Sequence, residues 1–255
     1  PASGKFSSWK MGSEPSAIAA DGDNNLVVAT RKGFIRLNTT SGEITDICPA
    51  PYDPAVNRFN DGRVDPAGRF WVGTMYEPRD KPAAEMYVLE RDKLRLAWSG
   101  GMTNSNGLAW TPDGGTMFHA DTTSHRIDCY DFDVAAGTVA NGRNLVVFST
   151  DKSAADYGGR PDGAAVDADG NYWVAMFEGG RLLKLSPTGE LLREVQLPLR
   201  CPTAVAFGGS DLRTLYVTSA SHGRSAAEMA QYPLTGKVLC MKVDVAGLVQ
   251  PEYRR

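Results

Sequence analysis

Residues 61–75 read DGRVDPAGRFWVGTM, and four further stretches of the chain follow the same pattern. Each stretch begins with a polar residue and a short apolar run, passes through a turn rich in Asp, Asn, Pro and Gly, and ends in a second apolar run. Short apolar runs separated by such turns are typical of β-strands. The other four stretches are SAIAADGDNNLVVAT (16–30), NGLAWTPDGGTMFHADT (106–122), DGAAVDADGNYWVAMF (162–177) and TAVAFGGSDLRTLYVTS (203–219).

A third strand-like run follows every unit, and most units continue through a turn into a fourth run. Examples of the third run are GFIRLN (33–38) and RIDCYDFD (126–133), and an example of the fourth is GELLREVQL (189–197). Four short antiparallel strands repeated about every 40–50 residues are typical of a β-propeller blade. A β-sandwich would also alternate short strands, but it would not repeat one pattern along the chain. The sequence therefore predicts an all-β propeller.

The units begin near residues 16, 61, 106, 162 and 203, which gives five complete blades. Residues 1–15 hold one more strand-like piece, GKFSSWKM (4–11), with no strands of its own before it. We interpret residues 1–15 as the remnant of a first blade. The expectation is a single six-bladed β-propeller domain over residues 1–255, with the first blade incomplete in this chain.

The composition excludes several classes of protein. A net charge of −3 gives no reason to expect a nucleic-acid or anionic-membrane partner. We find no apolar run long enough to span a bilayer and no secretory leader. The cysteines are scattered and form no metal-binding pair, which favours free thiols in a reducing compartment. They are Cys48, Cys129, Cys201 and Cys240. We therefore expect a cytoplasmic protein without a membrane or nucleic-acid partner; its oligomeric state is unknown.

Polar residues recur at the start of each unit. The first strand of a propeller blade lines the central channel, so residues at its entry converge from different blades. Two carboxylates and an amide with nothing basic between them would repel one another unless a cation lay among them, and oxygen ligands suit Ca²⁺, Mg²⁺ or Mn²⁺. Taken singly, Asn-Gly and Asp-Gly are hairpin turn signals, so ordinary turns are the alternative. The five positions are Ser16, Asp61, Asn106, Asp162 and Thr203.

A second set of acidic residues lies between the first and second strands of a unit. The turns DPAG, TPDG and DADG occupy that place and contain Asp65, Asp113 and Asp169. Asp and Gly are the residues that tight turns favour. We therefore expect these three carboxylates to be structural.

Four segments together resemble the senescence marker protein/gluconolactonase family, which includes regucalcin. They are NRFNDGRVDPAGRFWVGTM (57–75), SNGLAWTPDG (105–114), RPDGAAVDADGNYWVAMFEGG (160–180) and FGGSDLRTLYVTSA (207–220). The resemblance runs from about residue 9 to the C-terminus. Members of that family are six-bladed propellers that hydrolyse sugar lactones with one divalent metal ion, and the resemblance implies the same fold and activity here.

The resemblance also implies roles for individual residues. Asn106 and Asp162 match the positions of two metal ligands, and Asp162 would also act as the catalytic general base. Arg58 and Asn60 match the positions that hold the substrate. Glu77 lies near the position of a further substrate contact in some members, although Pro78 competes for that position.

The family's third metal ligand is a Glu in a Gly-Glu-x-Pro segment, some 40 residues upstream of where this chain begins. The stretch GSEPSAI (12–18) mimics that segment, but its surroundings match the next blade. We therefore expect Glu14 in a loop at the channel mouth. Either the chain lacks the inner strands of the first blade, or this variant has lost a ligand.

The sequence thus predicts a metal-dependent lactonase that opens sugar lactones to aldonic acids. Its cofactor would be one divalent ion (Ca, Mg, Mn or Zn), its partner a small sugar lactone, and its pocket would be walled by loops 76–85, 150–160 and 221–233. The alternative is a non-catalytic divalent-metal-binding propeller of regucalcin type. The missing Glu favours that alternative, whereas Arg58 and Asn60 argue against it, because a scaffold does not need them.

Overall fold

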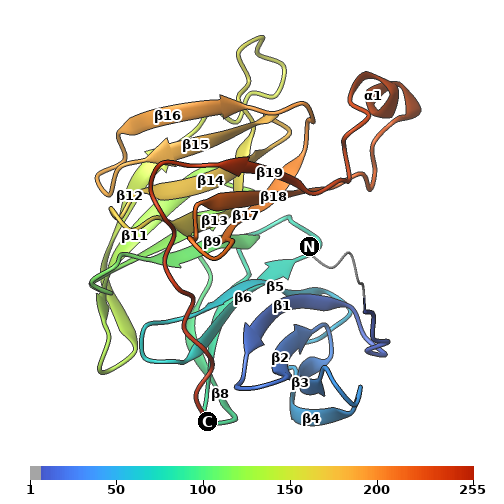
Figure 1. Ribbon diagram of the computed structural model, residues 1–255, viewed down its shortest axis with the longest axis vertical. Coiled ribbons are helices and arrows are strands. Elements are labelled where there is room, and N and C mark those ends of the chain that lie inside the picture. The colour runs from blue at the N-terminus through green and yellow to red at the C-terminus, as the bar shows by residue number, and fades with distance from the viewer. Residues whose placement is uncertain (1–6) are drawn as a thin grey trace.

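The computed structural model describes residues 7–255, and its strands form five antiparallel sheets that follow one another along the chain (Figure 1). The first sheet contains β1 (Pro15–Ala20), β2 (Asn25–Thr30), β3 (Gly33–Asn38) and β4 (Ile44–Pro49). The second contains β5 (Asn57–Val64), β6 (Phe70–Tyr76), β7 (Glu85–Glu90) and β8 (Lys93–Ser99). The third contains β9 (Ser105–Trp110), β10 (Thr116–Asp121), β11 (Arg126–Asp133) and β12 (Thr138–Val147). The fourth contains β13 (Arg160–Val166), β14 (Tyr172–Phe177), β15 (Arg181–Leu185) and β16 (Leu191–Gln196). The fifth contains β17 (Pro202–Gly208), β18 (Thr214–Ser219) and β19 (Leu239–Lys242), with α1 (Ala226–Gln231) between its last two strands.

The all-β propeller is confirmed, but the expectation of six blades is wrong, because residues 7–255 form five. Part of the piece interpreted as a blade remnant, residues 4–6, lies outside the described residues. Residues 7–14 form no strand, and Pro15 already belongs to β1. The fifth sheet has three strands, so that unit is also less complete than its sequence indicated.

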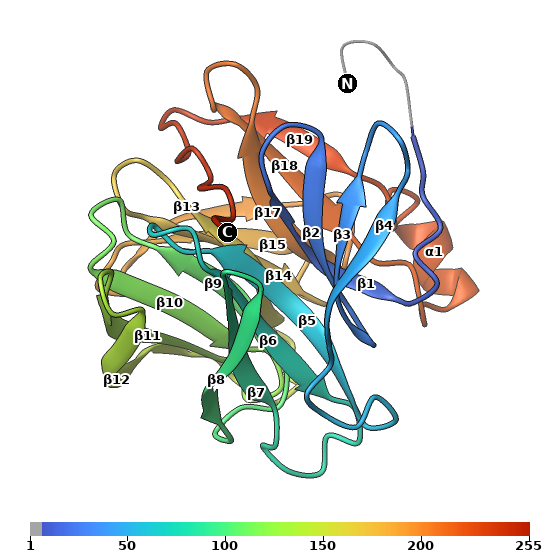
Figure 2. The same cartoon turned by 90° about the horizontal axis from the view of Figure 1, so that it is seen from below.

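The first strand of each sheet lies beside the first strand of the next. Contacts run from β1 to β5, from β5 to β9, from β9 to β13 and from β13 to β17. Figures 1 and 2 show these strands on the inner side of the sheets, with β4, β8, β12 and β16 on the outside. Residues that are far apart in the sequence therefore meet at the ends of the inner strands.

Each inner strand contains an irregularity in its register at the repeated polar position. The pairing of β5 with β6 shifts between Phe59 and Gly62, and that of β13 with β14 shifts between Pro161 and Ala164. A β-bulge turns a side chain out of the regular alternation of a strand. The polar residues expected to precede the inner strands thus lie within them, at bulges that change the direction of their side chains.

Glycine follows the polar residue in three of these bulges because atoms of neighbouring strands leave no room for a side chain. Gly107 has φ +62, and a Cβ there would lie 2.2 Å from the Tyr172 hydroxyl. A Cβ on Gly163 would lie 2.7 Å from the Cβ of Ala204 on β17. Both distances are too short for any other residue, so these glycines set the spacing of neighbouring blades.

The turns between first and second strands fix the aromatic core. Asp65 is fully buried and accepts hydrogen bonds from Arg69 Nε (2.6 Å) and from Trp71 Nε1 (2.8 Å). Asp167 plays the same part in the fourth sheet, where it accepts from Trp173 Nε1 (3.1 Å). The expectation of a structural role is thus met by Asp65, whereas in the DADG turn Asp167 and not Asp169 is the buried carboxylate.

The C-terminal segment runs from the fifth sheet back to the first two sheets (Figure 1). The Tyr253 amide donates to the Ala20 carbonyl (2.8 Å), and the Arg254 amide donates to the Gly68 carbonyl (2.9 Å). These contacts lie at the turns between first and second strands, which is the end of the sheets opposite the polar bulges. Within residues 7–255, no helix has the length and apolar character needed to cross a membrane.

Candidate active site

A cavity of about 190 Å³ lies at the beginnings of β5, β9 and β13. Four residues singled out in the sequence line it together: Arg58 and Asn60 from β5, Asn106 from β9 and Asp162 from β13. They come from three successive blades and are separated by about a hundred positions. The bulges at Asn60 and Asp162 explain why strand residues, which would otherwise alternate between faces, reach one cavity.

Asn60 connects the other residues of the cavity. Its amide nitrogen donates to Asn106 Oδ1 (3.0 Å) and to the Ser105 carbonyl (2.8 Å). Its Oδ1 accepts from Arg58 Nη1 (2.8 Å). Both amide hydrogens of Asn60 are thereby used, and its oxygen retains one lone pair. Asn60 therefore orients Arg58 and Asn106 and can still accept a hydrogen bond from a ligand.

Asp162 is surrounded by protein although it faces the cavity. Loss of hydration, together with the negative charge of Asp61, raises the pKa of Asp162 to about 8, against the opposing effect of Arg160 and Arg58. The sequence suggested that nothing basic lies among the converging acids. That premise is wrong, because Arg58 and Arg160 line the same cavity and the charge of Arg63 acts on Asp61.

The other three repeated polar positions do not line this cavity. The Asp61 carboxylate accepts from the backbone amides of Gly62 (2.9 Å) and Leu108 (3.2 Å), so it ties β5 to β9. Ser16 donates to the Ala29 carbonyl within its own sheet (3.1 Å), and Thr203 pairs with Thr218 (2.8 Å). Equivalent sequence positions thus serve different purposes in different blades.

Glu77 belongs to an ion-pair cluster at the rim. Arg31 binds both oxygens of Glu77 (2.9 Å each), and Arg58 Nε lies 3.5 Å from Glu77 Oε1. The hydrogen bond from Arg31 lowers the pKa of Glu77. Glu14 pairs with the same Arg31 (2.9 Å) and is about half exposed, in keeping with the mouth-loop position expected for it. No local pattern points to Arg31, because its partners are 17 and 46 positions away in the chain.

The cavity also contains polar residues that sequence reasoning missed. Arg79 lies in the 76–85 loop and Arg160 at the end of the 150–160 loop, so two of the expected wall segments do reach the cavity. Asn104 lies directly before β9, and its buried Oδ1 has no hydrogen-bond partner among residues 7–255. Arg160 stands directly before the PDG motif, and that adjacency was the only available signal.

The donor set of the cavity fits a hard divalent cation. Asn106 offers an amide oxygen, Asp162 a carboxylate deprived of hydration, and Asn104 an unpartnered amide oxygen. Oxygen ligands of this kind bind Ca²⁺, Mg²⁺ or Mn²⁺. Within residues 7–255 no group of three or more His, Cys, Asp or Glu side chains is arranged to hold a metal ion. Any cation in this cavity would therefore depend on amide oxygens.

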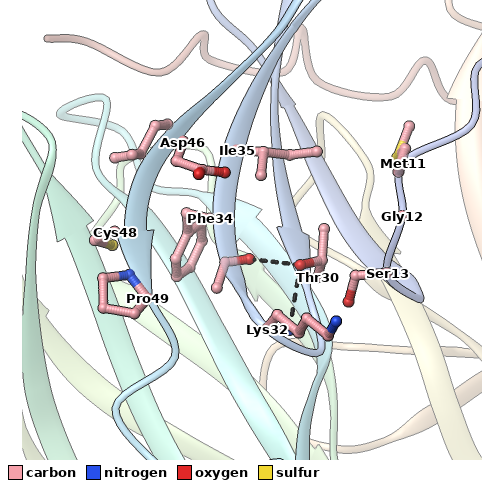
Figure 3. Close-up of a pocket in the computed structure, with 12 residues that line it drawn as sticks. Met11, Gly12, Ser13, Thr30, Lys32, Phe34, Ile35, Asp46, Cys48 and Pro49 are labelled. Carbon is pink, nitrogen blue, oxygen red and sulfur yellow. Dashed lines mark hydrogen bonds between the residues drawn. The ribbon is translucent and has the colours of Figure 1, made fainter.

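A larger cavity of about 400 Å³ lies elsewhere, between residues 11–13 and the strands β3 and β4 (Figure 3). Figure 3 shows Thr30 hydrogen-bonded within the β2–β3 turn, and Phe34, Ile35 and Cys48 along the wall. Its ionisable side chains are Lys32, Asp46 and Cys48. None of the predicted catalytic, substrate-binding or metal-binding residues lines it.

Comparisons with known proteins bear on this geometry. The family model described as SMP-30/Gluconolactonase/LRE-like region matches residues 1–221. A 6-deoxy-6-sulfogluconolactonase of Pseudomonas putida is 41% identical over 253 residues, which are 99% of this chain and 85% of that protein. A regucalcin of Gallus gallus is 33% identical over 243 residues, covering 93% of this chain and 79% of that protein. The crystal structure of a calcium-binding protein, regucalcin, from Agrobacterium tumefaciens superposes with a TM-score of 0.92 at 26% identity, covering 100% of this chain and 84% of that chain.

Proposed function

The chain belongs to the SMP-30/gluconolactonase/LRE-like family, and from that premise we propose that it is a hydrolase that opens sugar lactones to aldonic acids. The observation that carries the proposal is the convergence of Arg58, Asn60, Asn106 and Asp162 on one cavity. The Pseudomonas putida relative is named for a sulfonated gluconolactone, so lactones of that type belong among the substrates to be tested.

Binding of the lactone falls to Arg58 and Asn60. Within residues 7–255, the one hydrogen-bond acceptor of Arg58 Nη2 is the Met75 sulfur, 3.1 Å away. Sulfur is a weak acceptor, so this N–H can turn to a ring or hydroxyl oxygen of the sugar. The free lone pair of Asn60 Oδ1 can accept from a sugar hydroxyl. Because Asn60 also holds Arg58, the two contacts are set relative to each other before the lactone arrives.

Asp162 is placed to handle the proton of the attacking water. Water adds to the lactone carbonyl carbon, the bond from that carbon to the ring oxygen breaks, and the ring oxygen ends as a hydroxyl group. The Asp162 carboxylate takes the proton from the water and delivers it to the departing ring oxygen. A divalent cation held by Asn106 and Asp162, when bound, supplies positive charge that polarises the carbonyl oxygen.

The alternative is a propeller that binds a divalent cation without turning over a substrate. Its support is the donor set, which contains one carboxylate and otherwise only amide oxygens. The regucalcin relatives and the structure titled as a calcium-binding protein favour the same alternative. Under this alternative, Ca²⁺ would bind and no lactone would open.

A proton-release assay separates the two functions. The purified chain would be given δ-gluconolactone, xylonolactone and 6-deoxy-6-sulfogluconolactone, each with and without Mg²⁺, Ca²⁺, Mn²⁺ or Zn²⁺, and compared with spontaneous hydrolysis. We expect Asp162→Ala to abolish enzymatic opening while circular dichroism stays unchanged. Asp169→Ala, in an exposed turn of the same sheet, is the matched control and should retain full activity. Turnover by Asp162→Ala at the wild-type rate would refute the assignment.

A further inference from the structure

The cavity carries more positive than negative side chains. Arg58, Arg79 and Arg160 line it, and Asp162 is the one carboxylate among its lining residues in the described part of the chain. Neutral sugar hydroxyls need hydrogen bonds but not three guanidinium groups. We propose that the substrate is a sugar lactone that carries a tetrahedral oxyanion, a sulfonate or a phosphate, and that Arg79 and Arg160 bind this group. The inference rests on the proposed lactonase function and specifies its substrate class.

Arg79 is available for such a group. Within residues 7–255, its one side-chain hydrogen bond is a long one of 3.9 Å from Nη2 to the Met75 sulfur. No carboxylate within residues 7–255 lies in ion-pair range of Arg79, although Glu77 is two positions away. Its backbone adopts the left-handed conformation, with φ +58, which is costly for a residue with a long side chain. An arginine kept in a strained turn at a cavity, without an acidic partner, has an unused positive charge.

Arg160 has a partner, but that partner is shared by three cations. Arg160 Nη2 lies 3.4 Å from Glu178 Oε2, and Glu178 also pairs with Lys152 (3.2 Å) and Arg224 (3.3 Å). One carboxylate cannot neutralise three cations. The guanidinium lies over the Phe177 ring, 5.1 Å from its centre, and Arg160 Nε is buried without a hydrogen-bond partner. The ring thus helps to hold Arg160 in place, and sharing Glu178 with two other cations leaves part of its positive charge available.

The chemistry of two guanidinium groups favours a tetrahedral oxyanion. Guanidinium presents N–H donors in a planar fork that matches oxyanions and carboxylates. A sulfonate or phosphate offers three terminal oxygens, enough to engage two forks at once. Arg79 and Arg160 could therefore bind one sulfonate or phosphate together.

The test compares charged and neutral lactones in matched variants. Substrates are δ-gluconolactone, 6-deoxy-6-sulfogluconolactone and 6-phosphogluconolactone, and the comparison of the last two distinguishes a sulfonate from a phosphate site. The wild type should favour a charged lactone by about tenfold or more in kcat/KM. Arg79→Gln and Arg160→Gln should each remove most of that preference, mainly by raising KM for the charged lactones. Arg160→Lys should restore part of the preference.

Arg143→Gln is the control, because Arg143 is an exposed arginine paired with Asp131 on the outer strands of the third sheet. It should leave the preference unchanged. Equal kcat/KM values of the wild-type enzyme for δ-gluconolactone and for both charged lactones would overturn the inference. A uniform loss of activity on all three lactones in Arg79→Gln and Arg160→Gln would overturn it as well, since it would show a general rather than a charge-specific role.

Binding of the ring-opened products separates failure of this inference from failure of the proposed function. Calorimetry with 6-deoxy-6-sulfogluconate and gluconate requires no turnover. One outcome is that the wild type binds 6-deoxy-6-sulfogluconate, that Arg160→Gln does not bind it, and that neither protein opens a lactone. This outcome would uphold the anion site and refute the proposed lactonase function. Lactone opening with equal binding of the two products would uphold the lactonase and refute the anion site.

Discussion

Replacing Asn60 with alanine should disable the site while leaving the fold in place. The side chain makes three hydrogen bonds, to Arg58 Nη1 (2.8 Å), Asn106 Oδ1 (3.0 Å) and the Ser105 carbonyl (2.8 Å). The bond to Arg58 is charge-assisted and worth about 1.5–3 kcal/mol, and the two neutral bonds are worth about 1 kcal/mol each. Without them, Arg58 and Asn106 lose the group that sets their relative position.

The expected loss of kcat/KM in Asn60→Ala depends on whether these hydrogen bonds stabilise the site or the fold. If most of their energy serves to hold the site, kcat/KM for a sugar lactone should fall by about 3 kcal/mol, which is about a hundredfold. The free energy of unfolding should fall by only about 1–2 kcal/mol, because Asn60 is partly exposed and cavity water can replace its bonds. The variant should therefore be folded and nearly inactive.

The assay is initial-rate lactone opening at saturating metal, together with urea denaturation of the same preparations. Asn144→Ala is the matched control, because Asn144 is an exposed asparagine on β12, and it should change neither quantity by more than about 0.5 kcal/mol. A kcat/KM for Asn60→Ala within about threefold of the wild type would refute the reasoning. Equal losses of activity and stability would also contradict it, since they would show that Asn60 supports the fold and not the site.

Three further predictions concern stability and ligand binding. Asp65→Ala should lower the free energy of unfolding in urea by about 3–5 kcal/mol, because it leaves the buried Arg69 guanidinium without its partner, whereas Asp113→Ala at an exposed turn should cost no more than about 1 kcal/mol. Burial opposes the ionisation of Asp21, but Arg255 and Arg36 outweigh it and lower the pKa of Asp21. The contribution of Asp21 to stability is therefore present above the unfolded-state pKa of about 3.9 and is lost as pH falls through the lower folded-state pKa, so Asp21→Asn should flatten the loss of stability measured by urea titration below about pH 4. Addition of Ca²⁺ should raise the melting temperature of the wild type and not that of Asp162→Ala, and an equal rise in both would place the cation elsewhere.

Much of the fold follows from local patterns. The third run of the first unit, GFIRLN, coincides with β3, and RIDCYDFD coincides with β11. Such runs are predictable because alternation, turn residues and strand length all act over a few positions. The number of blades, in contrast, does not follow from local patterns. A strand-like piece such as GKFSSWKM becomes a strand only if a neighbour supplies hydrogen-bond partners, and within residues 7–14 it forms none.

The candidate site also contains residues that the sequence predicts and residues that only the structure reveals. The repeated units pointed to Asn106 and Asp162, because each lies at the start of the inner strand of its own blade, and the family resemblance added Arg58 and Asn60. The stacking of blades brings these four residues to one cavity. Only the tertiary structure decided that Arg79 and Arg160 share their cavity and that Glu77 is held by Arg31. It also decided that Asp61 binds backbone amides and that Thr203 pairs with Thr218. The physical reason is that a repeat fixes the path of the backbone, whereas the partner of a charged side chain depends on which loops from other blades end within a few ångströms of it.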